Sequence, residues 1–304
     1  MKKVSIENKN GIGTTIAALI NFPKGFNDSE KHSVIIVSHP GGGVKEQAAG
    51  LYAKKLSERG FVTVAFDRSY QGESTGEPRQ LENPHVSAED ISAVVDYLTT
   101  LPWVDRDRIG AMGVCAGAGY TANAAINDRR IKAVGTVSAV NIGQMFRNGW
   151  NNSVADADAV GYLDHGSWAR TSDAGGSDGA TIPLAPLSKE DAPNAELEQA
   201  WEYYHTPRCE HPNAPGFTLA RCLNQIITYD AYHKAEAFLT QPLLCIAGSE
   251  AGSKWMSDDL ITRAASADKT MHVVQGANHM DLYDGEDYVN EAVEVLADFF
   301  STKL

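Results

Sequence analysis

Short runs of β-branched and apolar residues recur along this chain, and most of them are followed by a stretch with helical patterning. Ser33–Ser38 (SVIIVS), Val62–Phe66 and Ile109–Val114 lack the polar alternation of a strand with one wet face. They therefore predict strands that are buried on both faces. A strand–helix alternation of this kind is typical of a mostly parallel, twisted sheet with helices on both faces. We predict an α/β fold of that type.

The remaining elements extend the same pattern. Thr14–Asn21 is predicted as an early strand, with Val4–Glu7 as its hairpin partner. Ser87 is expected to cap a helix that runs to about Thr100, because acidic residues at 89 and 90 suit its positive end. The other helices are predicted at 46–59, 116–127, 258–266 and 287–300, and the other strands at Ala133–Val137, Leu243–Ala247 and Met271–Val274.

The alternation breaks between residues 141 and 237. This stretch shows no clean strand, several prolines, and helical patches near 195–204 and 217–232. A structureless loop of that length is improbable inside a compact domain. We therefore predict a single domain of 304 residues, in which the core is 1–140 and 238–304 and a helical cap or lid is inserted at 141–237.

Composition limits the class of function. With 43% hydrophobic residues the chain can bury a large core, and its formal net charge of −13 argues against nucleic acid or an anionic membrane as a partner. No apolar run is long enough to cross a bilayer, and Met1–Asn8 lacks the apolar stretch of a secretory signal. The four cysteines have no CxxC spacing. We expect a cytoplasmic protein without metal or other cofactor, with a homodimer as the default oligomer.

The pentapeptide Gly113–Gly117 (GVCAG) joins a predicted buried strand to a predicted helix. A side chain at the centre of such a strained turn projects from the carboxyl edge of the sheet, and small neighbours let other backbone pass close by. Cys115 holds that position at a helix amino terminus, where free N–H groups favour a thiolate. A cysteine that merely packs is the alternative. The strand–turn–helix context favours a nucleophile.

Two further segments are expected at the same edge of the sheet. His279 follows the last predicted strand, so its imidazole is placed to act as the general base for Cys115, although the chain has nine histidines.

The other segment is a glycine-rich loop after an early strand, and His39 is expected to support it. Its glycines allow N–H groups to turn toward a developing oxyanion, with a plain turn as the alternative. The predicted oxyanion-hole donors are the N–H groups of Ala116, Gly41, Gly42 and Gly43.

Four stretches together resemble the dienelactone-hydrolase-like branch of the α/β-hydrolase superfamily. They are His39–Gln47 (HPGGGVKEQ), Ala65–Arg79 (AFDRSYQGESTGEPR), the Cys115 turn and the His279 loop. More narrowly, they are similar to bacterial hydrolases with GxCxG in place of GxSxG. The resemblance implies a Cys115 nucleophile, a His279 base, and cofactor-independent hydrolysis of a small ester, lactone or thioester.

The carboxylate of the expected catalytic triad is the weak member. Related sequences often carry Asp shortly after the strand that ends near Ala247, but this chain has Ala251 and Gly252 there. Glu250 is the nearest carboxylate, and an exposed loop residue is its alternative interpretation. Without it, a Cys–His dyad is expected, because a thiol depends less on the acid than a serine does.

Nearby carboxylates and the chain as a whole have further interpretations. Asp281 is expected to order its own loop, and Glu46 is related only loosely to a dienelactone-hydrolase glutamate that contacts the thiol. The same acyl-enzyme would also serve an acyltransferase, and a degenerate fold that only binds a ligand is a third hypothesis. Aromatic residues of the cap are expected to enclose an apolar pocket. These are Trp150, Trp168, Trp201, Tyr203, Tyr204 and Phe217.

Overall fold

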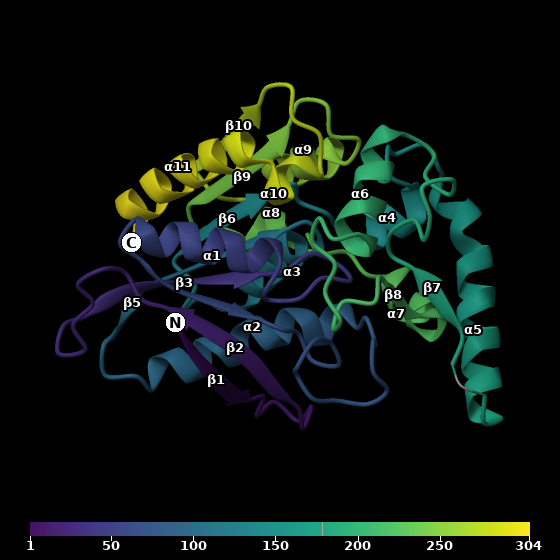
Figure 1. Cartoon of the computed structure of the whole chain (residues 1–304), viewed down its shortest axis with the longest axis horizontal. Helices are drawn as coiled ribbons and strands as arrows, with labels where there is room; N and C mark the ends of the chain where they lie inside the picture. Colours follow the sequence, from purple (N-terminus) through teal and green to yellow (C-terminus); the bar gives the residue numbers. More distant parts are fainter. Residues whose placement is uncertain (178) are drawn as a thin grey trace.

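An eight-stranded sheet runs through the computed structural model, which describes residues 1–177 and 179–304 (Figure 1). The second strand in space, β2, is antiparallel to both of its neighbours, and every later pair is parallel. The mostly parallel sheet predicted from sequence is thus confirmed. In spatial order the strands are β1 (Lys2–Glu7), β2 (Thr15–Asn21), β4 (Val62–Phe66), β3 (His32–Ser38), β5 (Val104–Val114), β6 (Ala133–Val137), β9 (Leu243–Gly248) and β10 (Lys269–Val274).

Burial explains why the central strands were visible in the sequence. Every residue of β4, β6 and β9 is buried, so neither face of these strands tolerates polar alternation. The parallel register brings the carboxyl ends of β3, β5, β6, β9 and β10 to one edge of the sheet. Loops that leave these ends therefore meet, and the predicted site residues lie in them.

Helices cover both faces of the sheet. α1 (Ala48–Glu58) packs against α11 (Glu286–Lys303) on the face that is uppermost in Figure 1, and α2 (Pro84–Thr99) lies beneath the sheet beside α3 (Ala116–Asn127). Shorter helices follow later strands. They are α8 (Ala235–Phe238), α9 (Lys254–Arg263) and α10 (Asp281–Asp284).

The predicted start of α2 was wrong. Asn83 rather than Ser87 is its N-cap, and the Asn83 side chain accepts hydrogen bonds from the N–H groups of His85 and Val86. Pro84 at the first helical position has its φ preset for a helix and needs no hydrogen-bond partner. Ser87 lies buried within the first turns.

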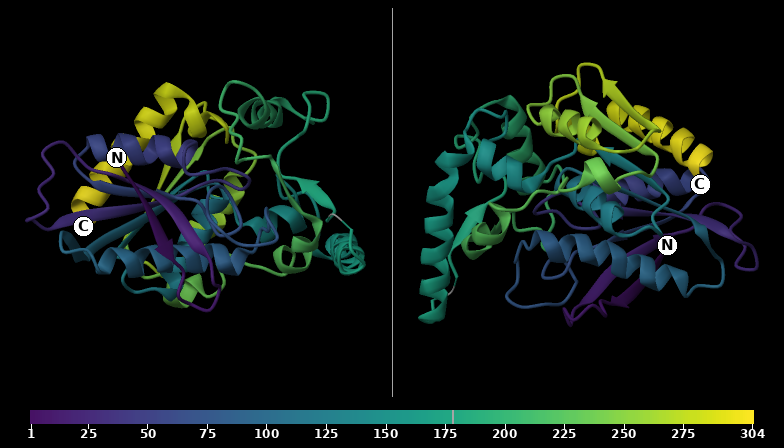
Figure 2. Two further views of the ribbon diagram at one scale, coloured as in Figure 1. Left: turned by 60° about the horizontal axis from the view of Figure 1, so that its bottom comes forward. Right: turned by 180° about the vertical axis from the view of Figure 1, so that it is seen from behind.

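The segment between β6 and β9 forms a group of elements beside one end of the sheet (Figures 1 and 2). The unpredicted feature is a two-stranded antiparallel sheet, whose three-residue strands are too short to give a periodic signal. In both figures α5 stands at the outer edge of the molecule, and residue 178, inside the predicted insertion, lies outside the described residues. The elements are α4 (Ile142–Asn148), η1 (Asp156–Ala159), α5 (Val160–Ala174), β7 (Thr181–Pro183), α6 (Ala195–His205), β8 (Phe217–Leu219), η2 (Ala220–Cys222) and α7 (Leu223–Ile226).

Across the described ranges, 1–177 and 179–304, no helix combines the length and the apolar character that crossing a membrane requires.

Candidate active site

Cys115 occupies a strained turn between β5 and α3. Its φ of 57° and ψ of −125° are rarely adopted by a residue with a side chain. The flanking glycines make the turn possible, because a Cβ at Gly113 would collide with the carbonyl of Gly117, and a Cβ at Gly117 with that of Ser38. The close approach predicted for this turn is therefore a backbone-to-backbone contact. It aims the thiol away from the sheet edge and into the site.

The Cys115 thiol is buried, with 8% of the residue exposed. Burial raises the pKa of the thiol above its ordinary value, because the anion loses its hydration. The Tyr283 hydroxyl, the N–H groups of Ala116 and Gly41, and the Arg68 cation oppose that effect. The helix amino terminus was expected to favour a thiolate, but desolvation outweighs it in this structure.

The glycine-rich loop contributes one donor at the thiol rather than three. Gly41 presents its N–H to Cys115 beside that of Ala116. Gly43 instead donates its N–H to the Pro40 carbonyl at 3.1 Å, which closes a turn. Gly42 has a positive φ of 69° and packs under Leu184 of the insertion. The structure therefore brings Gly41 and Ala116 together at the thiol and commits Gly43 to the shape of the loop.

A buried arginine and His39 hold this loop from beneath. The Arg68 guanidinium donates to the His39 carbonyl at 2.6 Å and lies 5.0 Å from the ring centre of Tyr120. His39 Nε2 accepts a hydrogen bond from the backbone N–H of Arg68 at 3.3 Å. The proton of the neutral ring is therefore on Nδ1, which donates to the Pro40 carbonyl at 2.8 Å. Burial and the Arg68 charge keep the pKa of His39 well below its ordinary value. The neutral imidazole thus acts as a brace for the loop.

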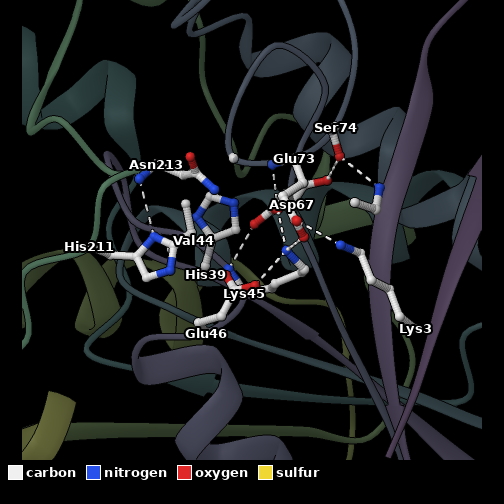
Figure 3. A network of polar contacts seen from close by, with 12 residues as sticks. Lys3, His39, Val44, Lys45, Glu46, Asp67, Glu73, Ser74, His211 and Asn213 are labelled. Carbon is white, nitrogen blue, oxygen red and sulfur yellow. Dashed lines mark hydrogen bonds and ion pairs between the residues drawn. The ribbon is translucent and has the colours of Figure 1, made fainter.

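The segment that follows this loop is anchored by ion pairs of the buried Lys45 (Figure 3). Lys45 Nζ pairs with the carboxylates of Asp67 and Glu73 at 2.7 Å each, and with Glu46 at 2.6 Å. The Lys45 N–H also donates to Asp67 at 2.8 Å. The ammonium groups of Lys3 and Lys45 lower the pKa of Glu73 to about 2. The Glu46 carboxylate is thus paired with Lys45, whereas the dienelactone-hydrolase glutamate to which it is loosely related contacts the thiol.

His279 lies in the loop between β10 and α10, and its ring is buried. Its Nδ1 is 2.6 Å from the Ser253 hydroxyl, and its Nε2 is 3.3 Å from the Tyr283 hydroxyl. Burial lowers the pKa of His279 to about 3, so the imidazole is neutral near pH 7. Because the Tyr283 hydroxyl also interacts with the thiol of Cys115, it lies between the His279 imidazole and the Cys115 thiol.

Glu250 does not reach this histidine. Its side chain is exposed and accepts a hydrogen bond from the Ser249 hydroxyl at 3.2 Å. The backbone explains the direction, because the Glu250 N–H donates to the Ala277 carbonyl at 2.9 Å and leaves the side chain facing solvent. The loop turns back three residues later, at the start of α9, and there Ser253 faces the imidazole. The structure thus places a hydroxyl where the acid was expected.

Sequence reasoning missed Ser253 and Tyr283. A signal for Tyr283 existed, because it follows His279 by four residues, and a helical turn places such residues on one face. Ser253 had no comparable signal among the many serines of the loops. Asp281 behaves as predicted within its own loop, accepting the Asn278 N–H at 2.9 Å.

An apolar cavity of about 90 Å³ opens above the thiol. A water molecule needs about 10–15 Å³ of such space, so the cavity suits a short organic group. Helix α6 supplies part of the roof through Leu197, Ala200 and Tyr204, and the Tyr204 hydroxyl donates to the Gly41 carbonyl at 3.0 Å. The other lining residues are Gly41, Cys115, Ala116, Val140, Ile142, Met145, Trp150, Leu184, His279, Met280 and Tyr283.

Only part of the aromatic set predicted for the pocket is there. Trp150 and Tyr204 line the cavity, whereas Trp168 on α5 is 58% exposed. Tyr203 is buried beside the site, and its hydroxyl accepts the Ala48 N–H at 2.9 Å. Tyr203 therefore packs α6 onto α1 and does not line the cavity.

The strand order, the strained turn after β5 and the histidine loop after the last strand together define an α/β hydrolase fold and site. The sequence profile of the Alpha/beta hydrolase family matches residues 34–292, and the chain belongs to that family. Members of this family are typically hydrolases.

Several known proteins are similar along most of their length. The uncharacterised protein YcjY of Escherichia coli K12 is 65% identical over 302 residues, which cover 99% of each chain. The crystal structure of PA2218 from Pseudomonas aeruginosa has a TM-score of 0.91 at 34% identity, covering 100% of this chain and 93% of that one. The quorum-quenching protein AidA of Acinetobacter baumannii is 25% identical, over 84% of this chain and 82% of AidA.

Proposed function

We propose that this protein is a cofactor-independent hydrolase that cleaves a small ester, lactone or thioester through an acyl-enzyme on Cys115. One observation carries the proposal: the thiol lies under two converging N–H groups, those of Ala116 and Gly41, with the His279 imidazole one hydroxyl away. Converging donors of this kind stabilise the oxyanion of acyl transfer. The sequence motifs favour the dienelactone-hydrolase-like branch with a GxCxG turn.

In the proposed first half-reaction, Sγ attacks the carbonyl carbon as the Cys115 thiol gives its proton to the Tyr283 oxygen. Tyr283 passes a proton on to His279 Nε2, and the oxyanion accepts from Ala116 and Gly41. The imidazolium then protonates the departing alcohol or thiol as its bond to carbon breaks. In the second half-reaction, His279 takes a proton from water as the water oxygen attacks the acyl carbon. The bond from the acyl carbon to Sγ then breaks, the carboxylic acid leaves, and the imidazolium returns its proton to Cys115 through Tyr283.

Ser253 takes the orienting role that a carboxylate has in a triad. With the proton on His279 Nδ1 donated to the Ser253 oxygen, the Nε2 lone pair faces Tyr283 and can accept a proton. A hydroxyl stabilises the imidazolium less than a carboxylate does, and a thiol nucleophile tolerates that loss better than serine. We therefore favour a Cys115–His279 dyad that Ser253 orients, without Glu250.

The test is a screen of short esters, lactones and thioesters with Cys115→Ala, using Cys209→Ala as the matched cysteine control. We expect Cys115→Ala to lose at least roughly 1,000-fold in kcat, as for removal of other catalytic nucleophiles, while Cys209→Ala and Glu250→Gln keep their rates. Intact-mass analysis of the wild type should show an acyl adduct that is absent from Cys115→Ala. Unchanged turnover in folded Cys115→Ala would disprove the mechanism.

A further inference from the structure

Glu196 lies in the first turn of α6, in the insertion, and its carboxylate gathers three hydrogen-bond donors. It accepts the backbone N–H of His279 at 2.8 Å, the indole N–H of Trp150 at 2.6 Å and the N–H of Gly252 at 3.3 Å. Hydrogen bonds to an ionised acceptor are stronger than neutral ones. One anion thus joins the base loop, the loop after β9 and the insertion.

The missing side chain at Gly252 makes room for this arrangement. A Cβ at that position would lie 2.7 Å from Trp150 Cδ1, 2.8 Å from its Nε1 and 3.0 Å from Glu196 Oε2. The loop that lacks an aspartate at Ala251 and Gly252 therefore receives a carboxylate from the insertion. That carboxylate contacts the backbone of the histidine loop, whereas the ring Nδ1 is held by Ser253.

Trp150 completes the connection between the insertion and the core. Its ring meets the His279 imidazole edge-on at a centroid distance of 4.7 Å. Its carbonyl accepts the indole N–H of Trp255, on α9 of the core, at 3.0 Å. The insertion therefore contacts the base through the Trp150 ring and holds its backbone through Glu196.

We propose that Glu196 is a positioning residue, which sets the His279 loop for reaction only when α6 and Trp150 are seated on the core. The catalytic part of this inference rests on the proposed function, whereas the structural part does not. The physical basis is that the loop N–H groups of His279 and Gly252 depend on a partner that another segment of the chain supplies.

The experiment compares Glu196→Ala and Glu196→Gln with Glu198→Ala. Glu198 lies two residues along the same helix, but its carboxylate pairs with Lys189. The primary readout is an NMR pH titration of the His279 ring, which faces the hydroxyls of Ser253 and Tyr283 and the Trp150 indole. In Glu196→Ala, we expect water to reach the ring and its pKa to rise from about 3 toward the ordinary value of about 6.5.

Activity gives the second readout. Glu196→Ala should lose roughly 100-fold in kcat with a smaller change in KM, the effect expected when a catalytic group is misplaced by about 1 Å. Glu196→Gln keeps one acceptor oxygen and should fall between Glu196→Ala and the wild type. Gly252→Ala keeps Glu196 but places a methyl group in the space that the Glu196 carboxylate and the Trp150 ring occupy. It should therefore shift the pKa of His279 as Glu196→Ala does, and it provides the test if Glu196→Ala folds poorly.

The inference fails if Glu196→Gln and Gly252→Ala match Glu198→Ala in both the His279 titration and kcat. The titration needs no turnover, so a shifted pKa in a protein without hydrolase activity would support Glu196 and overturn the proposed function. Variants that keep wild-type hydrolase activity and an unshifted His279 pKa would support the proposed function and overturn the role of Glu196.

Discussion

At Cys115 and His279, burial keeps both partners neutral. Desolvation raises the pKa of the thiol and lowers that of the imidazole to about 3. A thiolate–imidazolium pair, the resting form of many cysteine enzymes, is therefore disfavoured in this closed structure. In the proposed mechanism the proton therefore moves during the reaction, and Tyr283 lies where it can carry it.

This charge state predicts the pH dependence of alkylation by iodoacetamide. Only the thiolate reacts, and the raised pKa means that its fraction grows about tenfold per pH unit through at least pH 8.5. His279 titrates near pH 3, so it adds no step between pH 5 and 9. Tyr283→Phe removes a donor that favours the anion and should move the profile to still higher pH. An alkylation rate of the wild type that stays constant between pH 5 and 8 would contradict a neutral Cys115 thiol and a neutral His279 imidazole.

At the scale of elements, the turn between β5 and α3 is shaped by close backbone contacts with the end of β3. Gly117 approaches the carbonyls of Ser38 and His39 at the end of β3, where any side chain would meet backbone. The strand, the glycines and the helix that follow one another here were all recognisable in the sequence. This is why the position of Cys115 could be predicted, whereas Ser253 and Tyr283 were not.

Two glycine substitutions test that contact. Gly117→Ala should lower the free energy of unfolding by about 1–3 kcal/mol or more, because backbone cannot move aside as a side chain can. Gly161→Ala, in α5, meets nothing within 4 Å and should raise stability by up to about 1 kcal/mol through helix propensity. Urea unfolding followed by circular dichroism measures both. Equal effects of the two substitutions would contradict the close approach.

At the scale of the whole molecule, the cavity lies between the sheet edge and the insertion that covers it. Core residues such as Cys115 form its floor, and Leu184, Leu197 and Tyr204 of the insertion form its roof. Substrate size should therefore be set by the insertion, and chemistry by the core.

Shortening the roof should change the preferred acyl chain. In Leu197→Ala the cavity widens, so kcat/KM for longer-chain esters relative to short ones should rise roughly 10-fold, the scale of one methylene in an apolar pocket. Leu187→Ala is the control, because Leu187 is in the same insertion but 57% exposed. A chain-length profile of p-nitrophenyl esters measures the effect. Identical profiles for the two variants would place the acyl group elsewhere.

The sequence by itself determined the sheet, the turn at Cys115 and the loop that carries His279, because continuous burial and glycine contacts leave local patterns. Only the tertiary structure decided what surrounds them. Glu250 and Ser253 lie three residues apart, and the path of one loop points the first to solvent and the second to the imidazole. Glu196 reaches the base loop from 83 residues away, a distance over which no local periodicity carries information.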